Sequence, residues 1–89
     1  MNAIISVTGK DNFGIISAVS GECTECCVNI LDISQTVLGE YFVMIMLVDI
    51  DKTNVPFTEF VDRMEKLGRS KNLVIRTMHE DIFNAMHKI

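Results

Sequence analysis

The 89-residue sequence predicts an α+β fold, in which one antiparallel sheet of four strands carries two helices on one face. Two observations lead to this prediction. β-Branched or alternating apolar segments occur at 2–8, 28–38, 41–50 and 72–78, and helical apolar spacing occurs at 15–27 and 57–67. The order strand, helix, strand, strand, helix, strand is the split βαβ arrangement. We expect one domain over residues 1–89, with a C-terminal amphipathic tail over 79–89.

The first half of the pattern starts with the β-branched segment NAIISVT, which the loop GKDNFG ends. A helix is then expected to bury Ile16, Val19, Cys23 and Cys26, which are spaced by three, four and three. In the strand over 28–38 the apolar residues change phase. Val28 and Ile30 are predicted on one side, and Leu31, Ile33 and Val37 on the other.

The second half starts with a tight turn at Gly39-Glu40, after which the strand over 41–50 returns. Thr53 and Asn54 offer capping oxygens for the second helix, and Pro56 suits its first turn. The apolar stripe of that helix is Phe57, Phe60, Val61, Met64 and Leu67, and Gly68 suits its end. The tail places Ile82, Phe83, Met86 and Ile89 on one side.

The strand over 41–50 is apolar on both faces, because Tyr41, Val43, Ile45 and Leu47 alternate with Phe42, Met44, Met46 and Val48. Such a strand is normally buried on both faces. Two helices on one side of the sheet cover only one of them. We therefore expect the tail or a second subunit to cover the other, and predict a homodimer or a larger assembly.

Composition excludes several classes of function. Hydrophobic residues make up 48% of the chain and charged residues 22%, as in a globular protein. The net charge is −4 without a cluster of basic residues, which argues against direct nucleic-acid binding. The apolar run over 41–48 is too short to span a membrane. An odd number of cysteines and no signal peptide indicate the reducing cytoplasm.

The stretch GECTECCVN places Cys23, Cys26 and Cys27 close together, which raises the question of a metal or redox site. Cys23 and Cys26 continue the helix stripe, where cysteine behaves as a small hydrophobic residue. Cys27 is expected half-exposed at the helix end. A structural zinc site needs four ligands, and the two histidines, His79 and His87, belong to the tail. We predict core cysteines, no metal and no cofactor.

The loop TGKDNFG is the more informative segment. It joins a strand to a helix start, where unpaired N–H groups and a partial positive charge favour a carboxylate. Asp11 and Asn12 stand at this place, and either could cap the helix. Asp11 could instead hold an ammonium group. N–H donors for a carboxylate and an acceptor for an amine together suit a free amino acid.

The segment VTGKDNFGIISAVSGECTECCVNILDISQ resembles the opening of an ACT domain, a small ferredoxin-like regulatory module attached to many amino-acid biosynthetic enzymes. The likeness is most specific at Asp11, at Gly14-Ile15-Ile16 and at Val28-Asn29-Ile30. It covers the whole chain in element order. With nothing else attached, the chain resembles the short stand-alone ACT proteins, which are akin to the regulator of the glycine cleavage system.

This resemblance implies an amino-acid ligand at a homodimer interface built from the first helix and the second strand. The residues it implies for ligand binding are Asp11, Asn12, Phe13, Gly14, Ile15 and, from the neighbouring subunit, Asn29. Phe13 departs from the family pattern, which often has proline there. A regulated enzyme or a transcription regulator is the partner that the resemblance implies.

Catalytic function is not indicated. Acylphosphatases share the fold plan but need an arginine in the first loop, where this chain has only Lys10. No Ser/His/Asp or Cys/His set follows from local spacing. The sequence predicts a cytoplasmic sensor of a small molecule that is not an enzyme. A ligand-free docking module is the alternative, and a thiol-based metal or redox carrier a further one.

Overall fold

The computed structural model describes residues 1–10 and 14–86 and confirms the predicted fold class. The elements follow the predicted order, with one short helix added after the last strand. They are β1 (Asn2–Gly9), α1 (Ile15–Glu25), β2 (Asn29–Leu38), β3 (Tyr41–Asp49), α2 (Phe57–Ser70), β4 (Val74–His79) and α3 (Glu80–Met86). The strands form one antiparallel sheet in the order β2-β3-β1-β4.

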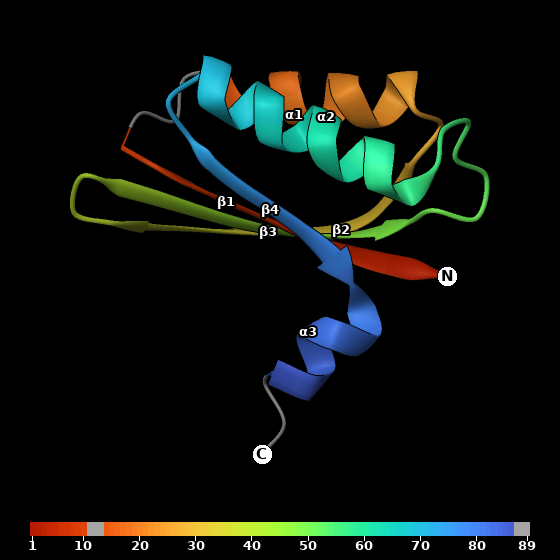
Figure 1. Ribbon diagram of the computed structural model, residues 1–89. Coiled ribbons are helices and arrows are strands. Elements are labelled where there is room, and N and C mark those ends of the chain that lie inside the picture. Colours follow the sequence, from red (N-terminus) through yellow and green to blue (C-terminus); the bar gives the residue numbers. More distant parts are fainter. Residues whose placement is uncertain (11–13, 87–89) are drawn as a thin grey trace.

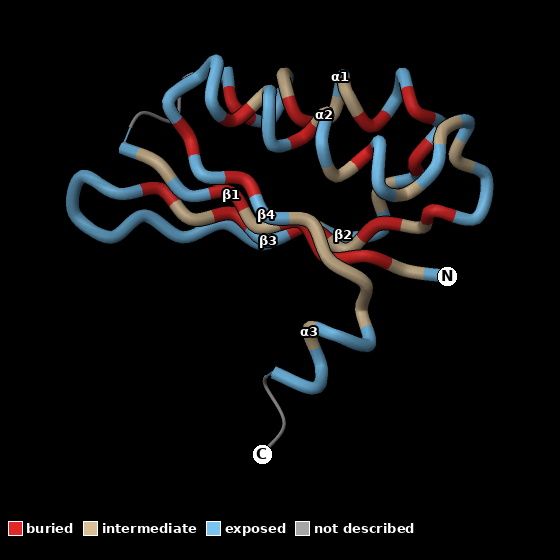
Figure 2. Tube along the Cα trace, in the orientation of Figure 1, coloured by how far each residue is buried: buried red, intermediate tan, exposed pale blue. Residues whose placement is uncertain are grey.

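The two long helices lie side by side on one face of the sheet, and α3 lies on the opposite side (Figure 1). The core fills the layer between the helices and the sheet (Figure 2). Its largest fully buried side chains are those of Phe60, Ile5, Met44, Met46, Met64, Val7, Val19, Val48, Cys23 and Cys26. We call the sheet face toward the helices the inner face and the other the outer face.

The buried stripe of α1 begins one residue earlier than predicted. Ile15 is 2% exposed, whereas Ile16 is 41% exposed. Ile15, Val19 and Cys23 are spaced by four residues, which keeps them on one side of a helix with 3.6 residues per turn. The prediction for Ile16 was therefore wrong, because a step of three was chosen where a step of four was equally compatible with a helix.

The phase change in β2 is a β-bulge. Ile30 pairs with Val48 and Asp32 pairs with Leu47, so that Leu31 is an extra residue without a counterpart on β3. The extra residue resets the alternation. Ile30, Ile33 and Val37 consequently share the inner face, where the sequence had placed Ile30 apart from the other two.

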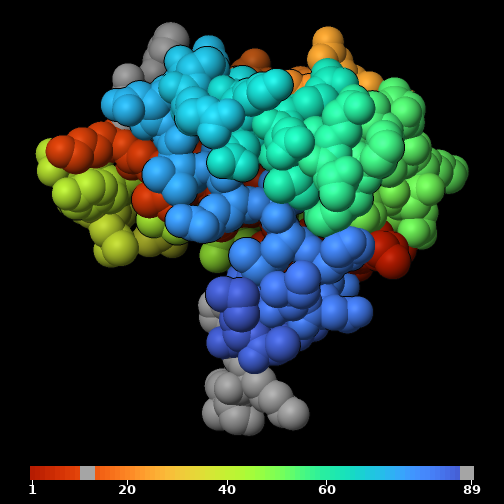
Figure 3. All heavy atoms as spheres, in the orientation of Figure 1, coloured from red at the N-terminus to blue at the C-terminus, as the bar shows by residue number. Residues whose placement is uncertain are grey.

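The described residues of one chain leave the outer face of β3 partly exposed. Phe42, Met44, Met46 and Val48 of the same strand are buried under the helices, but on the outer face Tyr41 is 48% exposed and Ile45 39%. α3 has no buried residue, and it protrudes from the body of the molecule (Figure 3). The predicted tail also begins one residue later, because His79 belongs to β4.

The loop between β3 and α2 holds the end of α1. The backbone N–H of Asn54 donates to the carbonyl oxygen of Cys26 at 3.0 Å, and its side-chain amide donates to that of Glu25 at 2.9 Å. Asn54 thus caps the end of α1, where the sequence had suggested a cap for α2. Pro56, which was expected within the first turn of α2, is instead the N-cap residue that precedes it.

α2 passes Gly68, its predicted end, and continues to Ser70. The helix closes with Asn72 in the left-handed conformation, at a φ of 59°, and the N–H of Leu73 donates to the Gly68 carbonyl at 2.8 Å. Gly68 thus does not end the helix, but it is buried where α2 packs against the start of β4. A Cβ there would lie 2.9 Å from the carbonyl oxygen of Leu73 and 3.0 Å from Cγ1 of Ile75. The absence of a side chain lets α2 approach the start of β4.

Gly68→Ala is expected to destabilise the fold. Alanine in a helix interior gains roughly 0.5–1 kcal/mol over glycine, but overpacking against backbone costs about 1–3 kcal/mol, so the clash outweighs the gain. Gly21→Ala is the matched control, because Gly21 also lies inside a helix and its Cβ would meet nothing within 4 Å. Chemical denaturation should show a lower free energy of unfolding for the first variant and a higher one for the second. If both variants changed the free energy of unfolding equally and in the same direction, the close approach of α2 to β4 at Gly68 would be contradicted.

Candidate functional site

The start of α1 is formed by Gly14, which adopts a left-handed backbone with φ of 72° and ψ of 6°. The carbonyl oxygen of Gly14 accepts a hydrogen bond from the N–H of Ala18 at 3.0 Å, and this bond closes the first turn of the helix. Non-glycine residues adopt this conformation at a cost of about 1–2 kcal/mol. A Cβ at Gly14 would meet nothing within 4 Å in the described part of the chain. Gly14 is therefore required by its torsion and not by contact with another described residue.

The first turn of α1 has no acidic residue, and no described side chain caps it. Its leading N–H groups consequently have no side-chain acceptor within residues 1–10 and 14–86. Such groups, with the positive end of the helix dipole, are suited to an anion. Ile15 contributes only backbone here, since its side chain is buried in the core. Asp11, Asn12 and Phe13, also predicted as ligand contacts, lie outside the described residues.

Asn29 lies at the other end of the molecule. It pairs with Asp49, which in turn pairs with Asn2 at the start of β1. Gly14 is the N-cap residue of α1, which follows the opposite end of β1 at Gly9, and Figure 1 shows α1 connected to that end. Eight residues of strand separate the two ends by roughly 24 Å. One chain therefore does not bring Asn29 and Gly14 together.

Lys10 marks the loop end of the sheet. Its ammonium group lies 3.7 Å from a carboxylate oxygen of Glu40 and 5.8 Å from the centre of the Tyr41 ring. Both partners belong to the β2–β3 turn region. Because the pair is exposed, it adds little stability, and the Lys10 charge at this end of the sheet already has Glu40 as its partner.

Cys23 and Cys26 are fully buried, which confirms their prediction as core residues. Burial raises the pKa of the Cys23 thiol to about 12, and it also raises the pKa of Cys26. Cys27 is exposed. No group of three or more His, Cys, Asp or Glu residues in the described ranges could hold a metal ion.

The cluster of cysteines is the closing turn of α1. The N–H of Val28 donates to the Cys23 carbonyl at 2.8 Å, and that of Cys27 donates to the Thr24 carbonyl at 3.1 Å. Cys27 itself has a φ of 58°. This is the Schellman arrangement, whose left-handed position is usually glycine. The side-chain amide of Asn54 lies 3.4 Å from the Cys27 sulfur. The stretch GECTECCVN is thus a helix end.

Of the two histidines, His79 lies at the end of β4, where its ring packs on Phe57 with centroids 4.3 Å apart. His79 is half-buried and belongs to β4, whereas the sequence had assigned it to the tail. His87 lies outside the described residues.

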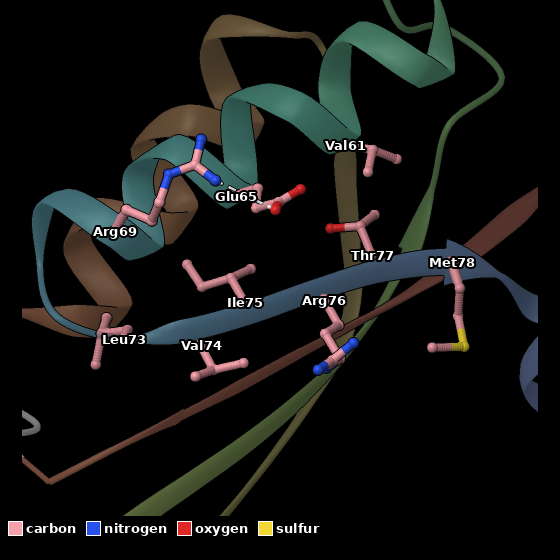
Figure 4. Close-up of a pocket in the computed structure, with 9 residues that line it drawn as sticks. All are labelled: Val61, Glu65, Arg69, Leu73, Val74, Ile75, Arg76, Thr77 and Met78. Atoms are coloured by element: carbon pink, nitrogen blue, oxygen red, sulfur yellow. Dashed lines mark hydrogen bonds and ion pairs between the residues drawn. The ribbon is translucent and has the colours of Figure 1, made fainter.

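A groove of about 420 Å³ lies along the free edge of β4, beneath α2 (Figure 4). Val61 and Ile75 contribute apolar surface, and the exposed ion pair between Glu65 and Arg69, at 3.3 Å, stands over it. The Thr77 hydroxyl is buried there without a hydrogen-bond partner in the described structure. Sequence reasoning missed this groove, because only the tertiary structure shows how α2 lies against β4.

The comparisons with known proteins agree with this fold. Residues 2–70 match the family model of the ACT domain. A UPF0237 protein of Clostridium perfringens is 47% identical over all 89 residues of this chain and over 100% of its own length. The chain therefore belongs to the ACT domain family, as the resemblance in its sequence had implied. Its described helices include none long and apolar enough to cross a membrane.

Solved structures extend the likeness. An ACT domain protein from Streptococcus pneumoniae has a TM-score of 0.82 and 44% identity, with 93% of each chain covered. A putative glycine cleavage system transcriptional repressor has a TM-score of 0.68 and 24% identity over 85% of this chain and 43% of its own. At that identity the second likeness establishes the shared fold alone.

The three thiols should differ in reactivity. A thiol reagent attacks the thiolate, so the buried Cys23 and Cys26, with raised pKa values, should react slowly at pH 8 until the chain unfolds. Cys27 should react first. The measurement is the time course of labelling by mass spectrometry, with a denatured sample as the control. Rapid labelling of all three in the native protein, or about one bound metal per chain, would contradict a core role.

Proposed function

We propose that this chain is a regulatory domain that senses an amino acid at a homodimer interface and acts through a partner protein, without catalysis of its own. Membership of the ACT domain family supports a regulatory role. The observation that carries the proposal is the start of α1, where Gly14 is left-handed and, within residues 1–10 and 14–86, no atom would meet a Cβ at Gly14 and no side chain caps the N–H groups. These donors suit the ligand's carboxylate, and Asp11 would accept from its ammonium group.

The ligand site needs two chains in this proposal. Asn29 and Gly14 lie at opposite ends of one subunit, roughly 24 Å apart by strand length. A two-fold axis perpendicular to the sheet, beside β2, would run two β2 strands antiparallel. It would thereby bring Asn29 of each subunit to the end where α1 of the other begins. Leu38, at 63% exposed, and Ile16, at 41%, lie on the elements that this dimer would use.

The compartment proposed is the cytoplasm, because the described cysteines are free thiols and two of them are core residues. The partner proposed is a regulated enzyme or a transcription regulator. The groove beside β4 favours one alternative, a ligand-free docking module, since a free strand edge with an unpaired hydroxyl could accept an extended peptide.

Gly14→Val is expected to abolish amino-acid binding while the sheet remains folded. The β-branched side chain would strain the left-handed turn and fill the open space before the helix N-terminus. Gly39→Val is the matched control, since Gly39 has a φ of 61° and equally open surroundings at the β2–β3 turn. Calorimetric titration with the common amino acids is the measurement. Absence of binding by the wild-type dimer would discard the sensor and favour the docking module.

Asp11→Ala and Asn29→Ala should each weaken binding by roughly 10- to 150-fold, the equivalent of a lost hydrogen bond to a charged group. Because the two residues act from opposite subunits, a mixture of the variants should form dimers with one intact site. Partial recovery of binding on mixing is therefore expected, after exchange of subunits is checked by native mass spectrometry. If exchanged dimers bind no better than either parent, the site is not shared between chains.

A further inference from the structure

The groove beside β4 is lined by consecutive residues of the chain, 73–78, and by one side of α2. At about 3.3–3.4 Å a residue, the strand side of the groove is roughly 20 Å long. Val61, Glu65 and Arg69 line the helix side, four residues apart and therefore on one side of α2. Figure 4 shows α2 running alongside β4 over this length. A groove of this shape suits a segment of extended chain better than a compact molecule.

β4 is an edge strand, because among the described strands it pairs only with β1. Alternate residues of an antiparallel strand direct their N–H and C=O groups to the same neighbour, so roughly half of those in β4 direct theirs toward the groove. Proteins usually protect such an edge with proline, lysine or a bulge. The sequence of β4, VIRTMH, contains neither proline nor lysine, and its pairing with β1 is regular. The edge can therefore accept a further strand.

The inner side of the groove contains a hydroxyl group that lacks a partner. Thr77 pairs with Ile5, which is fully buried beneath the helices, so Thr77 also points to the inner face. Ile75, two residues earlier, shares that face. The Thr77 hydroxyl is buried and has no hydrogen-bond partner in the described structure. Since buried polar groups are nearly always hydrogen-bonded, an occupant of the groove is expected to supply this bond.

The outer side of the groove contains a free cation. Arg76 points to the outer face with Val74 and Met78, because side chains alternate along a strand. It is exposed and has no ion-pair partner within residues 1–10 and 14–86. The other cation of the groove, Arg69, is paired with Glu65 at 3.3 Å. Charge complementarity therefore favours an acidic side chain next to Arg76.

We propose that this groove binds an extended segment of the partner protein, which pairs with β4 as a fifth, antiparallel strand of the sheet. The inference deepens the proposed function and rests on it, since there the chain acts through a partner. Antiparallel pairing continues the arrangement of the other strands and is slightly more stable per residue than parallel pairing. In this mode main-chain hydrogen bonds supply affinity, and alternate side chains supply specificity.

The strand register gives the sequence of the partner segment. Residues directly opposite each other have Cβ atoms about 4.5–5.5 Å apart. An acidic residue opposite Arg76 and a hydroxyl residue opposite Thr77 are consequently neighbours in the segment. Apolar residues lie opposite Ile75, Val74 and Met78. In the antiparallel direction the segment is apolar, hydroxyl, acidic, apolar, apolar, and Val-Thr-Glu-Ile-Val is a simple example built from strand-forming residues.

A fluorescein-labelled Val-Thr-Glu-Ile-Val peptide tests the inference by fluorescence anisotropy. The matched control, Val-Glu-Thr-Ile-Val, has the same composition but turns its carboxylate toward α2 and its hydroxyl toward Arg76. The first peptide should bind in a saturable manner and at least about tenfold more tightly, because an unpaired charge is costly to bury. If it does not bind, or if the two peptides bind equally, the proposal is overturned.

Charge exchange tests the register. Arg76→Glu should weaken binding of Val-Thr-Glu-Ile-Val by about 3- to 10-fold and should strengthen binding of Val-Thr-Lys-Ile-Val, since opposite charges then face each other. Lys66→Glu, on the exposed side of α2, changes the net charge equally and should leave both affinities unchanged. The same preference for the acidic peptide in Arg76→Glu and in the wild type would refute the pairing.

Thr77→Val tests the hydroxyl group. The variant should bind the peptide roughly 2- to 10-fold more weakly, as expected for one lost hydrogen bond. The free protein should nevertheless melt at a higher temperature, because the variant removes a buried hydroxyl without a partner. A purely structural role of Thr77 would change stability and leave the affinity unchanged, and that result would remove Thr77 from the site.

Val61→Arg tests which molecule occupies the groove. Val61 is partly buried at the helix side, and an arginine there should block peptide binding. Asp62→Arg, at the exposed neighbouring position, is the control. Circular dichroism should show that both variants are folded, and light scattering should show an unchanged molar mass. A lower mass for Val61→Arg alone would mean that a second copy of the chain occupies the groove, which would overturn the proposal.

The groove is separate from the proposed ligand site. β2 and β4 are the two opposite edges of the sheet, so a dimer joined at β2 does not use β4. Calorimetric titration of the same protein with amino acids therefore distinguishes the two proposals. Peptide binding without amino-acid binding discards the sensor and supports the docking module with this groove. Amino-acid binding without peptide binding overturns the inference alone.

Discussion

The two long helices of this protein cover only one face of its sheet, and most of its other features follow from that constraint. On the inner face, Phe42, Met44 and Met46 of β3 are buried against α1 and α2. Burial of each such side chain contributes about 1.5–3 kcal/mol, so this layer supplies the main favourable term for the fold. The same strand presents Tyr41 and Ile45 on the outer face, where residues 1–10 and 14–86 form no second layer of helices.

Close packing of the helix layer depends on how each helix ends. α2 can lie against β4 because Gly68 has no side chain, and it closes through Asn72 in a left-handed turn. α1 closes in the same way through Cys27, although cysteine is less suited to that conformation than glycine. Between the helices, Arg63 bonds Glu22 at 2.7 Å and Glu25 at 3.0 Å, so an ion-pair network joins α1 to α2 at the end where Asn54 also holds α1.

The proposed functions use the parts of the molecule that this core leaves open. Among the described residues, the start of α1 offers backbone donors and no side chain that would meet a Cβ at Gly14, which suits a small anionic group. The proposed dimer would use the edge of β2. A regulatory domain gains from this arrangement, because a ligand held between subunits changes the stability of their association, and a partner can respond to that change.

Apolar periodicity and turn residues are local signals, and they were sufficient to predict the order of the elements, the antiparallel sheet and the helices on one face. The sequence also identified the family, through Gly14-Ile15-Ile16 and Val28-Asn29-Ile30. The burial of Cys23 and Cys26 was predictable because both fall on a helix stripe. The bulge at Leu31, the capping of α1 by Asn54 and the groove beside β4 became visible only in the folded chain. Each of these depends on contacts between segments far apart in the chain, and no local pattern contains that information.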